Sequence, residues 1–200
     1  LPYTEKHPTN PINPYGRTKL QIENIIFDWT NVSKSRSSIS LRYFNPVGAD
    51  FSGLIGEDPL GEPNNLMPLI LKTASGKRTR LNVFGGDYKT RDGSPERDYV
   101  HVVDLARAHL NAVQRIGEYK KLLHINIGSG KGTTVLELIK AFEHISARKI
   151  DFVISKKRAG DLPSFWANIK LAKVMLSWEP QLNIEKICED AWRYHERESR

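Results

Sequence analysis

The chain has 200 residues, of which 39% are hydrophobic and 26% are charged, so its composition excludes a disordered or fibrous protein. The formal net charge is +7, but the basic residues are scattered and only Lys156–Arg158 form a run. We therefore expect no nucleic-acid partner, and a mild positive field of this kind suits a small anionic ligand such as a diphosphate.

The first residue is Leu1, no apolar run is long enough to span a bilayer, and no signal segment is visible. We expect a cytoplasmic protein without a membrane partner, in a chain that lacks its natural start. Cys188 is the single cysteine and is expected to be a small core residue. The six histidines are dispersed and no zinc-binding spacing occurs, so we expect no metal.

Asn13 and Pro14 are typical of a helix start, and the pattern predicts a helix that ends near Asn31. Tyr15 and Lys19 fall on one side of this helix, in a stripe that we expect to face the core. The stripe is completed by Ile22, Ile26 and Trp29. An ammonium beside a partly desolvated phenol favours the phenolate, which can act as a general base on a sugar hydroxyl. A tyrosine and a lysine spaced in this way also occur for purely structural reasons, so the pair alone does not decide the matter.

Residues 39–44 alternate as a strand that should stop at Asn45-Pro46-Val47-Gly48. A helix followed by a strand indicates an α/β sheet, in which ligands gather at the carboxyl ends of the strands. Tyr43, Phe44 and Asn45 would therefore lie within reach of Tyr15. The turn-rich segment 53–63 is long enough to be functional.

Further elements follow in order. Asn64 or Asn65 should cap a helix that ends near Ser75, and residues 81–84 form a short strand. The helix 105–116 should bury Leu105, Ala108, Ala112 and Val113. Strands are expected at 122–127 and 150–154, and helices at 135–146, 168–176 and 183–197.

The segment Gly128–Thr134 looks like a phosphate-binding loop but fits neither common pattern. The Rossmann fingerprint requires a glycine where Thr133 stands, and the Walker spacing is absent. We interpret the loop as structural, with Thr134 and Glu137 forming a capping box for the next helix. From the residues alone, the chain is an α/β domain with a candidate Tyr-Lys site and an anion-friendly loop at Arg158.

Seven blocks of sequence resemble, in order and spacing, the UDP-glucose 4-epimerases of the extended short-chain dehydrogenase/reductases. The blocks span nearly the whole chain and are Asn13–Lys19, Leu41–Gly48, Ile55–Pro59, Asn64–Pro68, Leu81–Gly85, Arg97–Asp104 and Arg158–Asp161. The resemblance implies the carboxyl-terminal part of an NAD(P)-binding Rossmann-like fold with a smaller mixed α/β substrate-binding domain. Residues 1–47 would end the NAD-binding domain, and residues 48–200 would mainly form the substrate domain, with about 97–130 returning to the Rossmann sheet.

The resemblance also implies a reaction and a partner set. UDP-galactose and UDP-glucose would interconvert through a 4-keto intermediate on bound NAD, with Tyr15 and Lys19 as catalytic and cofactor-binding residues and Tyr43 near the nicotinamide. The implied substrate-binding residues are Tyr43, Phe44, Asn45, Asn64, Asn65, Leu66, Asn82, Val83, Phe84, Arg97, Arg158, Asp161 and Phe165. Phe165 stands where such enzymes limit sugar size, so we expect activity on plain hexoses and little on N-acetylated sugars. A homodimer is expected for the full-length protein.

The glycine-rich dinucleotide loop and the Ser/Thr partner of the catalytic tyrosine would lie upstream of Leu1. We therefore expect that this chain alone neither holds NAD nor turns over. Two other interpretations stay open. One is a related sugar-nucleotide 4,6-dehydratase or decarboxylase, and the other is a non-catalytic binding module.

Overall fold

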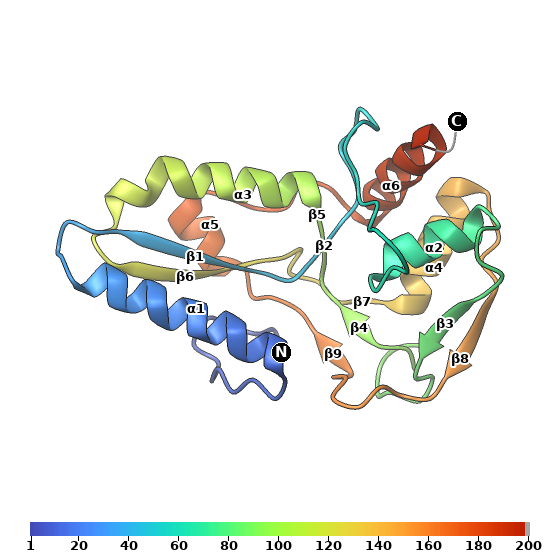
Figure 1. Cartoon of the computed structure of the whole chain (residues 1–200), viewed down its shortest axis with the longest axis horizontal. Helices are drawn as coiled ribbons and strands as arrows, with labels where there is room; N and C mark the ends of the chain where they lie inside the picture. The colour runs from blue at the N-terminus through green and yellow to red at the C-terminus, as the bar shows by residue number, and fades with distance from the viewer. Residues whose placement is uncertain (199–200) are drawn as a thin grey trace.

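The computed structural model of the protein describes residues 1–198, and it has the mixed α/β architecture with parallel strands that the sequence predicts (Figure 1). One end of the molecule is built on strands β1 (Ser38–Tyr43) and β6 (Leu122–Ile127). The helices around this pair are α1 (Pro14–Asn31), α3 (Val102–Arg115), the short 3-10 helix Ile116–Glu118, and α5 (Lys170–Leu176).

The other end is built on strands β3 (Leu81–Phe84) and β8 (Phe152–Ser155), which pair in parallel. Its helices are α2 (Leu66–Ala74), α4 (Val135–Ser146) and α6 (Ile184–Glu198). Short strands join the two ends, namely β2 (Asn45–Val47), β4 (Glu96–Arg97), β5 (Tyr99–His101), β7 (Thr133–Thr134) and β9 (Ser164–Phe165). Sequence-distant segments therefore meet in the middle of the molecule.

Strands β1 and β6 pair in parallel from Ser38 opposite Leu122 to Tyr43 opposite Ile127. Their side chains alternate, so one face of the pair is apolar and the other is polar. Ile125 and Ile127 are fully buried on the apolar face, where α3 and α5 cover them. Ser38 and Arg42 belong to the opposite face, which α1 covers. Figure 1 shows α1 and α3 on opposite sides of the two strands.

Helix α1 begins as predicted. The Asn13 side chain accepts a hydrogen bond of 2.7 Å from the Gly16 amide, and Pro14 occupies the first turn, where its missing N–H costs nothing. Two polar contacts attach the helix to the sheet. Arg42 donates through Nε and Nη2 to the two carboxylate oxygens of Glu23, both at 2.6 Å, and the hydroxyls of Thr30 and Ser38 lie 2.7 Å apart.

The expectation that the Tyr15–Trp29 stripe faces the core is wrong. Thr30 is the buried residue of α1, whereas Tyr15 is 72% exposed and Ile22 and Trp29 are about half exposed. The physical reason is that α1 lies on the polar face of the strands. Glu23 and Thr30, two turns apart, therefore point at the sheet together with the half-buried Ile26, and the rest of the stripe is exposed.

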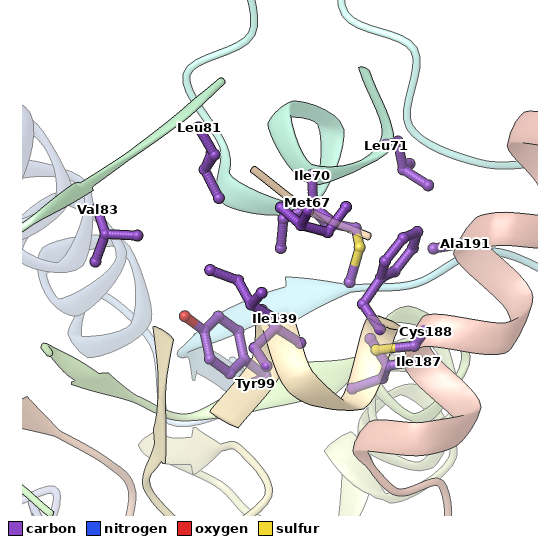
Figure 2. Close-up of a cluster of buried hydrophobic side chains, with 13 residues drawn as sticks. Met67, Ile70, Leu71, Leu81, Val83, Tyr99, Ile139, Ile187, Cys188 and Ala191 are labelled. Carbon is purple, nitrogen blue, oxygen red and sulfur yellow. The ribbon is translucent and has the colours of Figure 1, made fainter. Parts of the chain in front are cut away.

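The main hydrophobic core lies at the other end of the molecule. Figure 2 shows side chains from α2, α4, α6 and β3 pointing toward one another, among them Met67, Ile70 and Ile139. Cys188 is buried in this cluster, as predicted, and burial raises the pKa of its thiol to about 12. Such a thiol is inert, which confirms its structural role.

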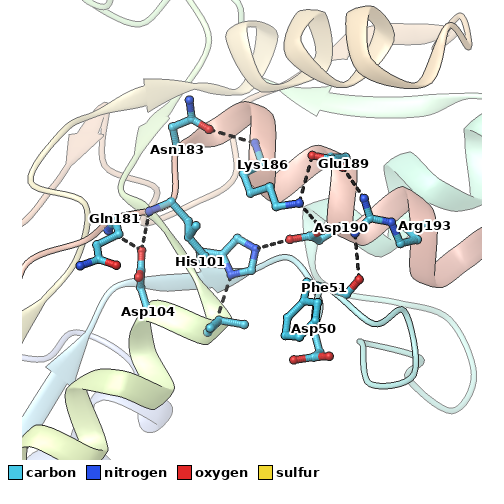
Figure 3. A network of polar contacts seen from close by, with 12 residues as sticks. Asp50, Phe51, His101, Asp104, Gln181, Asn183, Lys186, Glu189, Asp190 and Arg193 are labelled. Carbon is cyan, nitrogen blue, oxygen red and sulfur yellow. Dashed lines mark hydrogen bonds and ion pairs between the residues drawn. The ribbon is translucent and has the colours of Figure 1, made fainter.

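A buried polar network attaches α6 to the start of α3 (Figure 3). His101 Nδ1 accepts the Val103 amide, so Nε2 carries the proton and donates to Asp190 Oδ2 at 3.2 Å. Burial lowers the pKa of His101, which keeps the imidazole neutral. Lys186 and Arg193 both pair with the other oxygen of Asp190, so the buried carboxylate is compensated.

Several element boundaries differ from the expectations. Residues 45–47 continue as strand β2, paired in parallel with β5, because a strand of three residues needs few ladder hydrogen bonds and tolerates Pro46. Helix α3 starts three residues early, after His101, and Val113 on its outer side is 70% exposed rather than buried. The strand expected at 150–154 runs from Phe152 to Ser155 instead. The capping box of Thr134 and Glu137 is present as predicted.

Candidate active site

A cavity of about 470 Å³ lies between the two ends of the molecule and collects most of the predicted site residues. Its walls come from the first turn of α1, the carboxyl end of β1, the start of α2, strand β3 and the loop before β9. The predicted residues that line it are Tyr15, Tyr43, Phe44, Asn45, Asn64, Asn65, Leu66, Asn82, Val83, Phe84, Arg97, Arg158 and Asp161. The cavity thus lies at the carboxyl ends of parallel strands, where the α/β rule places ligand sites.

The phenol of Tyr15 faces this cavity from one side. Lys19, one turn later, lies outside the lining residues and places Nζ 5.0 Å from the centre of the Tyr15 ring. The ammonium and the phenol are therefore neighbours, as the helix spacing predicts. Both side chains are exposed in this structure, so the partial desolvation of the phenol that we expected from the sequence is absent.

Two arginines face the cavity from the opposite side. Arg97 donates through Nη1 to the carbonyl oxygens of Glu96 and Leu162, and its Nη2 lies 3.6 Å from the Asp161 carboxylate. The Arg158 guanidinium stacks 3.8 Å from the centre of the Phe84 ring. A guanidinium fork pairs with phosphate oxygens and a carboxylate accepts from sugar hydroxyls, so this wall matches a nucleoside diphosphate.

The start of α2 supplies amide groups to the cavity. Asn65 occupies the N-cap position, as predicted, but its side chain makes no cap hydrogen bond. Its Nδ2 donates instead to Glu57 Oε1 at 2.5 Å. The amide is therefore directed at the cavity side, where a ligand can compete for it.

Some lining residues were not singled out from the sequence. Glu57, Met67, Pro95, Tyr99 and Val135 line the cavity as well. Glu57 lies inside the Ile55–Pro59 block, but the sequence does not show that it is close to Asn65, because irregular chain connects the two over eight positions.

Phe165 is the one predicted substrate-binding residue that the structure keeps out of the cavity wall. Its ring stacks on Phe44 with centroids 4.6 Å apart, and on the other side it contacts Tyr3 at 4.9 Å. Phe165 therefore contacts Phe44, which does line the cavity.

Within residues 1–198, no helix is long and apolar enough to cross a membrane. Within the same described part of the chain, no group of three or more His, Cys, Asp or Glu side chains could hold a metal ion.

Fold and site together define a class of protein. Parallel strands of a Rossmann-like fold, a tyrosine and a lysine one helical turn apart, and a cavity that the tyrosine lines together with two arginines resemble the arrangement of the extended short-chain dehydrogenase/reductases. The model of the NAD dependent epimerase/dehydratase family matches residues 2–128, which is more than half of the chain. The chain belongs to this family.

Two curated relatives show which members of this family the chain is similar to. The chain is 46% identical over 197 residues to UDP-glucose 4-epimerase of Drosophila melanogaster and 46% identical over 195 residues to that of Homo sapiens. Each comparison covers 97% of this chain and 56% of the relative, so the chain spans little more than half the length of the relatives that it matches.

Solved structures give the same result for the fold. A UDP-glucose 4-epimerase from Stenotrophomonas maltophila with bound NAD and formylated UDP-arabinopyranose superposes with a TM-score of 0.96 at 41% identity, covering 99% of this chain and 59% of that one. A UDP-glucose 4-epimerase from Bifidobacterium longum in complex with NAD⁺ and UDP gives 0.94 at 40% identity, covering 100% and 59%. The predicted Rossmann-like fold and the resemblance to UDP-glucose 4-epimerases are confirmed.

Proposed function

We propose that this chain supplies the Tyr-Lys helix and the nucleotide pocket of a UDP-glucose 4-epimerase, which interconverts UDP-galactose and UDP-glucose. One observation carries the proposal. The Tyr15 phenol and the group formed by Arg97, Arg158 and Asp161 face the same cavity, although up to 146 positions separate them in the sequence. A sugar nucleotide held by the arginines can present its hexose to the phenol.

The nucleotide half of the ligand is assigned to the later segments. Arg97 and Arg158 would pair with the diphosphate, and Asp161 would accept hydrogen bonds from ribose hydroxyls. Main-chain and amide groups of Asn64, Asn65 and Leu66, together with the edge formed by Asn82, Val83 and Phe84, would border the rest. Binding would draw the Asn65 amide away from Glu57, because a phosphate oxygen is a competing acceptor.

The hexose half is assigned to the first helix and strand. Tyr15 would accept the proton of the sugar 4-hydroxyl as general base, and Tyr43, Phe44 and Asn45 would border the ring. NAD, when bound, would supply a reversible hydride acceptor for carbon 4 of the hexose. Lys19, whose ammonium lies 5.0 Å from the centre of the Tyr15 ring, would bind the hydroxyls of the nicotinamide ribose, and Tyr43 would lie near the nicotinamide.

We assign the limit on the size of the sugar to the packed aromatic rings of Phe44, Phe165 and Tyr3. Phe165 presses on Phe44 from behind and is itself backed by Tyr3, so Phe44 cannot retreat to admit a larger substituent. We expect plain hexoses to be accepted and N-acetylated sugars to be refused.

Binding of UDP to this 200-residue chain tests the nucleotide half. Isothermal titration should show saturable binding of UDP that is weakened at least tenfold in Arg97→Gln. Tyr15→Phe should bind UDP as the wild type does, because the phenol faces the sugar side. Absence of UDP binding, or salt-dependent binding of mixed oligonucleotides instead, would favour a non-catalytic module.

The catalytic half is tested in the full-length gene product. Conversion of UDP-galactose to UDP-glucose should fall by about 10³-fold or more in Tyr15→Phe while UDP affinity is retained. Formation of a 4-keto-6-deoxy sugar or of CO₂ would identify a dehydratase or decarboxylase. The 200-residue chain alone should retain no NAD after purification, because it contains no complete glycine-rich dinucleotide loop.

The remaining assignments concern the partner and the compartment. A homodimer is proposed, supported by the exposed apolar side chains of α1, among them Phe27 and Trp29. Sedimentation of the full-length gene product checks this. A cytoplasmic location is proposed from the identity of the sugar nucleotides, which fractionation can test.

A further inference from the structure

The glycine-rich loop Gly128–Gly132 does bind an anion, but the anion belongs to the chain itself. Asp98 Oδ1 accepts the Ser129 amide at 2.5 Å and the Ser129 hydroxyl at 2.7 Å. Asp98 Oδ2 accepts the Gly130 amide at 3.2 Å. Amide groups that could cradle a phosphate are thus occupied by an internal carboxylate, which explains why the loop resembles a phosphate-binding loop without matching its patterns.

The same carboxylate reaches a third segment. Asp98 Oδ2 also accepts the amide of Ala167 at 3.0 Å, and the Asp98 carbonyl oxygen accepts the amide of Asn45 at 3.0 Å. Asp98 is fully buried, so these four side-chain hydrogen bonds must offset the cost of removing the carboxylate from water. A Cβ at Gly128 would lie 2.3 Å from Asp98 Oδ2, which is the reason for a glycine there.

The segments that Asp98 joins also form the arginine wall of the cavity. Arg97 directly precedes Asp98, and β4 pairs with β9 through Arg97 opposite Phe165. Arg97 donates to Leu162 and lies beside Asp161. The hydrogen bond from Ala167 to Asp98 closes this strand pair just beyond β9.

We propose that Asp98 is a positioning residue for nucleotide binding, whose carboxylate fills the cradle of the glycine-rich loop and holds residues 161–167 against Arg97. This inference rests on the proposed function in one respect, namely that the cavity binds UDP. Asp98 is buried and does not line the cavity. It acts by keeping the Arg97 guanidinium and the Asp161 carboxylate directed into the cavity.

The chemistry of the site requires a carboxylate. An asparagine has the same shape, but its amide nitrogen would face either the Ser129 donors or those of Gly130 and Ala167. At least one main-chain N–H would then oppose another donor, because only the Ser129 hydroxyl can turn away to donate to the Lys131 carbonyl oxygen. Asp98→Asn should therefore break the hydrogen bonding to one of the joined segments, while the size of the side chain stays the same.

The test compares UDP with uridine in calorimetric titrations of the 200-residue chain. In Asp98→Asn, UDP affinity should fall about tenfold, as is typical when a group that orients a binding residue is lost, whereas uridine affinity should change little. A general loosening of the fold would lower both affinities. Asp104→Asn is the matched control, because Asp104 is equally buried and accepts the amides of Gln181 and Leu182 away from the cavity.

Hydrogen exchange provides a readout that does not depend on the ligand. Amides of residues 161–167 and 128–130 should exchange faster in Asp98→Asn than in the wild type and in the control. Ser129→Ala, which removes one of the four hydrogen bonds, should show the same changes to a smaller degree and serves if Asp98→Asn does not fold.

The outcomes separate the two proposals. Equal UDP affinity of a folded Asp98→Asn and the wild type, or equal loss for UDP and uridine, would overturn the positioning role. Unchanged exchange at 161–167 would overturn it as well. A third outcome is that the wild type binds no UDP while amides still exchange faster in Asp98→Asn than in the wild type. That result would support the link between the segments and contradict the proposed function.

Discussion

The two faces of the β1–β6 pair carry helices in different ways. On one face, Ile125 and Ile127 are fully buried under α3 and α5, together with Trp178. On the other, α1 is attached by an Arg42–Glu23 ion pair and a contact between the Thr30 and Ser38 hydroxyls. Apolar packing is non-directional and holds a helix over a broad area, whereas polar contacts fix its rotation at a few atoms.

This difference places the candidate chemistry on the polar side. Tyr15 heads a helix whose rotation depends on Glu23 two turns further on, so a change in the ion pair alters the direction of the phenol before it alters the fold. The four tests below contrast the two faces, beginning with the largest expected effect.

Shortening a side chain on the apolar face should lower the free energy of unfolding the most. Ile125→Ala leaves a cavity in a fully buried cluster and should lower the free energy of unfolding by about 2–5 kcal/mol. Ser40→Ala, on the polar face of β1, should change it by less than about 0.5 kcal/mol. Urea denaturation measures both, and similar losses would show that the faces do not differ as described.

Breaking the ion pair should act locally. Glu23→Gln leaves Arg42 without its charged partner and should destabilise the attachment of α1 by about 2 kcal/mol. Hydrogen exchange should increase in α1 more than in α3. The control Glu179→Gln removes an exposed pair with Lys173 and should cost at most about 0.5 kcal/mol. Equal exchange in both helices would contradict a local effect.

The hydroxyl contact should contribute less. Thr30 donates to the Ile26 carbonyl, so Ser38 is the donor to Thr30, and Ser38→Ala should cost about 1 kcal/mol. The double variant Thr30→Val with Ser38→Ala should cost less than the sum of the single variants, because no unpaired hydroxyl is left. Additive losses measured by thermal unfolding would argue against a direct bond.

Lowering the pH should give the smallest of the four effects, and it should act on the polar face. Burial raises the pKa of Glu23, but the hydrogen bond and charge of Arg42, with a further contribution from His124, outweigh it and lower the pKa below its ordinary value of 4.5. A carboxylate with a lowered folded-state pKa contributes stability that is present above 4.5 and is lost as the pH falls through the folded value. Exchange in α1 should therefore rise below pH 4.5 in the wild type, and Glu23→Gln should remove this dependence.

Local sequence signals predicted many elements of the fold. Asn13 and Pro14 fixed the start of α1, the capping box of Thr134 and Glu137 fixed the start of α4, and the strand 122–127 has the expected bounds. Most candidate site residues also lie together as expected, because the α/β rule brings the carboxyl ends of parallel strands to one edge. These features depend on residues close in sequence or on a general rule of topology.

Other features depended on partners that are distant in sequence. The periodicity of α1 showed an apolar stripe, yet the polar face of β1 decided that Glu23 and Thr30 point inward. The stacking of Phe165 on Phe44 depends on residues that lie far apart in the sequence. Asp98 is a single carboxylate between two short strands, and its partners in the glycine-rich loop lie 31 and 32 positions away. By itself, the sequence determined which chemical groups the chain offers and where several of its helices and strands begin. Only the tertiary structure decided which of those groups face the cavity, because long-range contacts set the rotation of each helix and the occupant of each amide cradle.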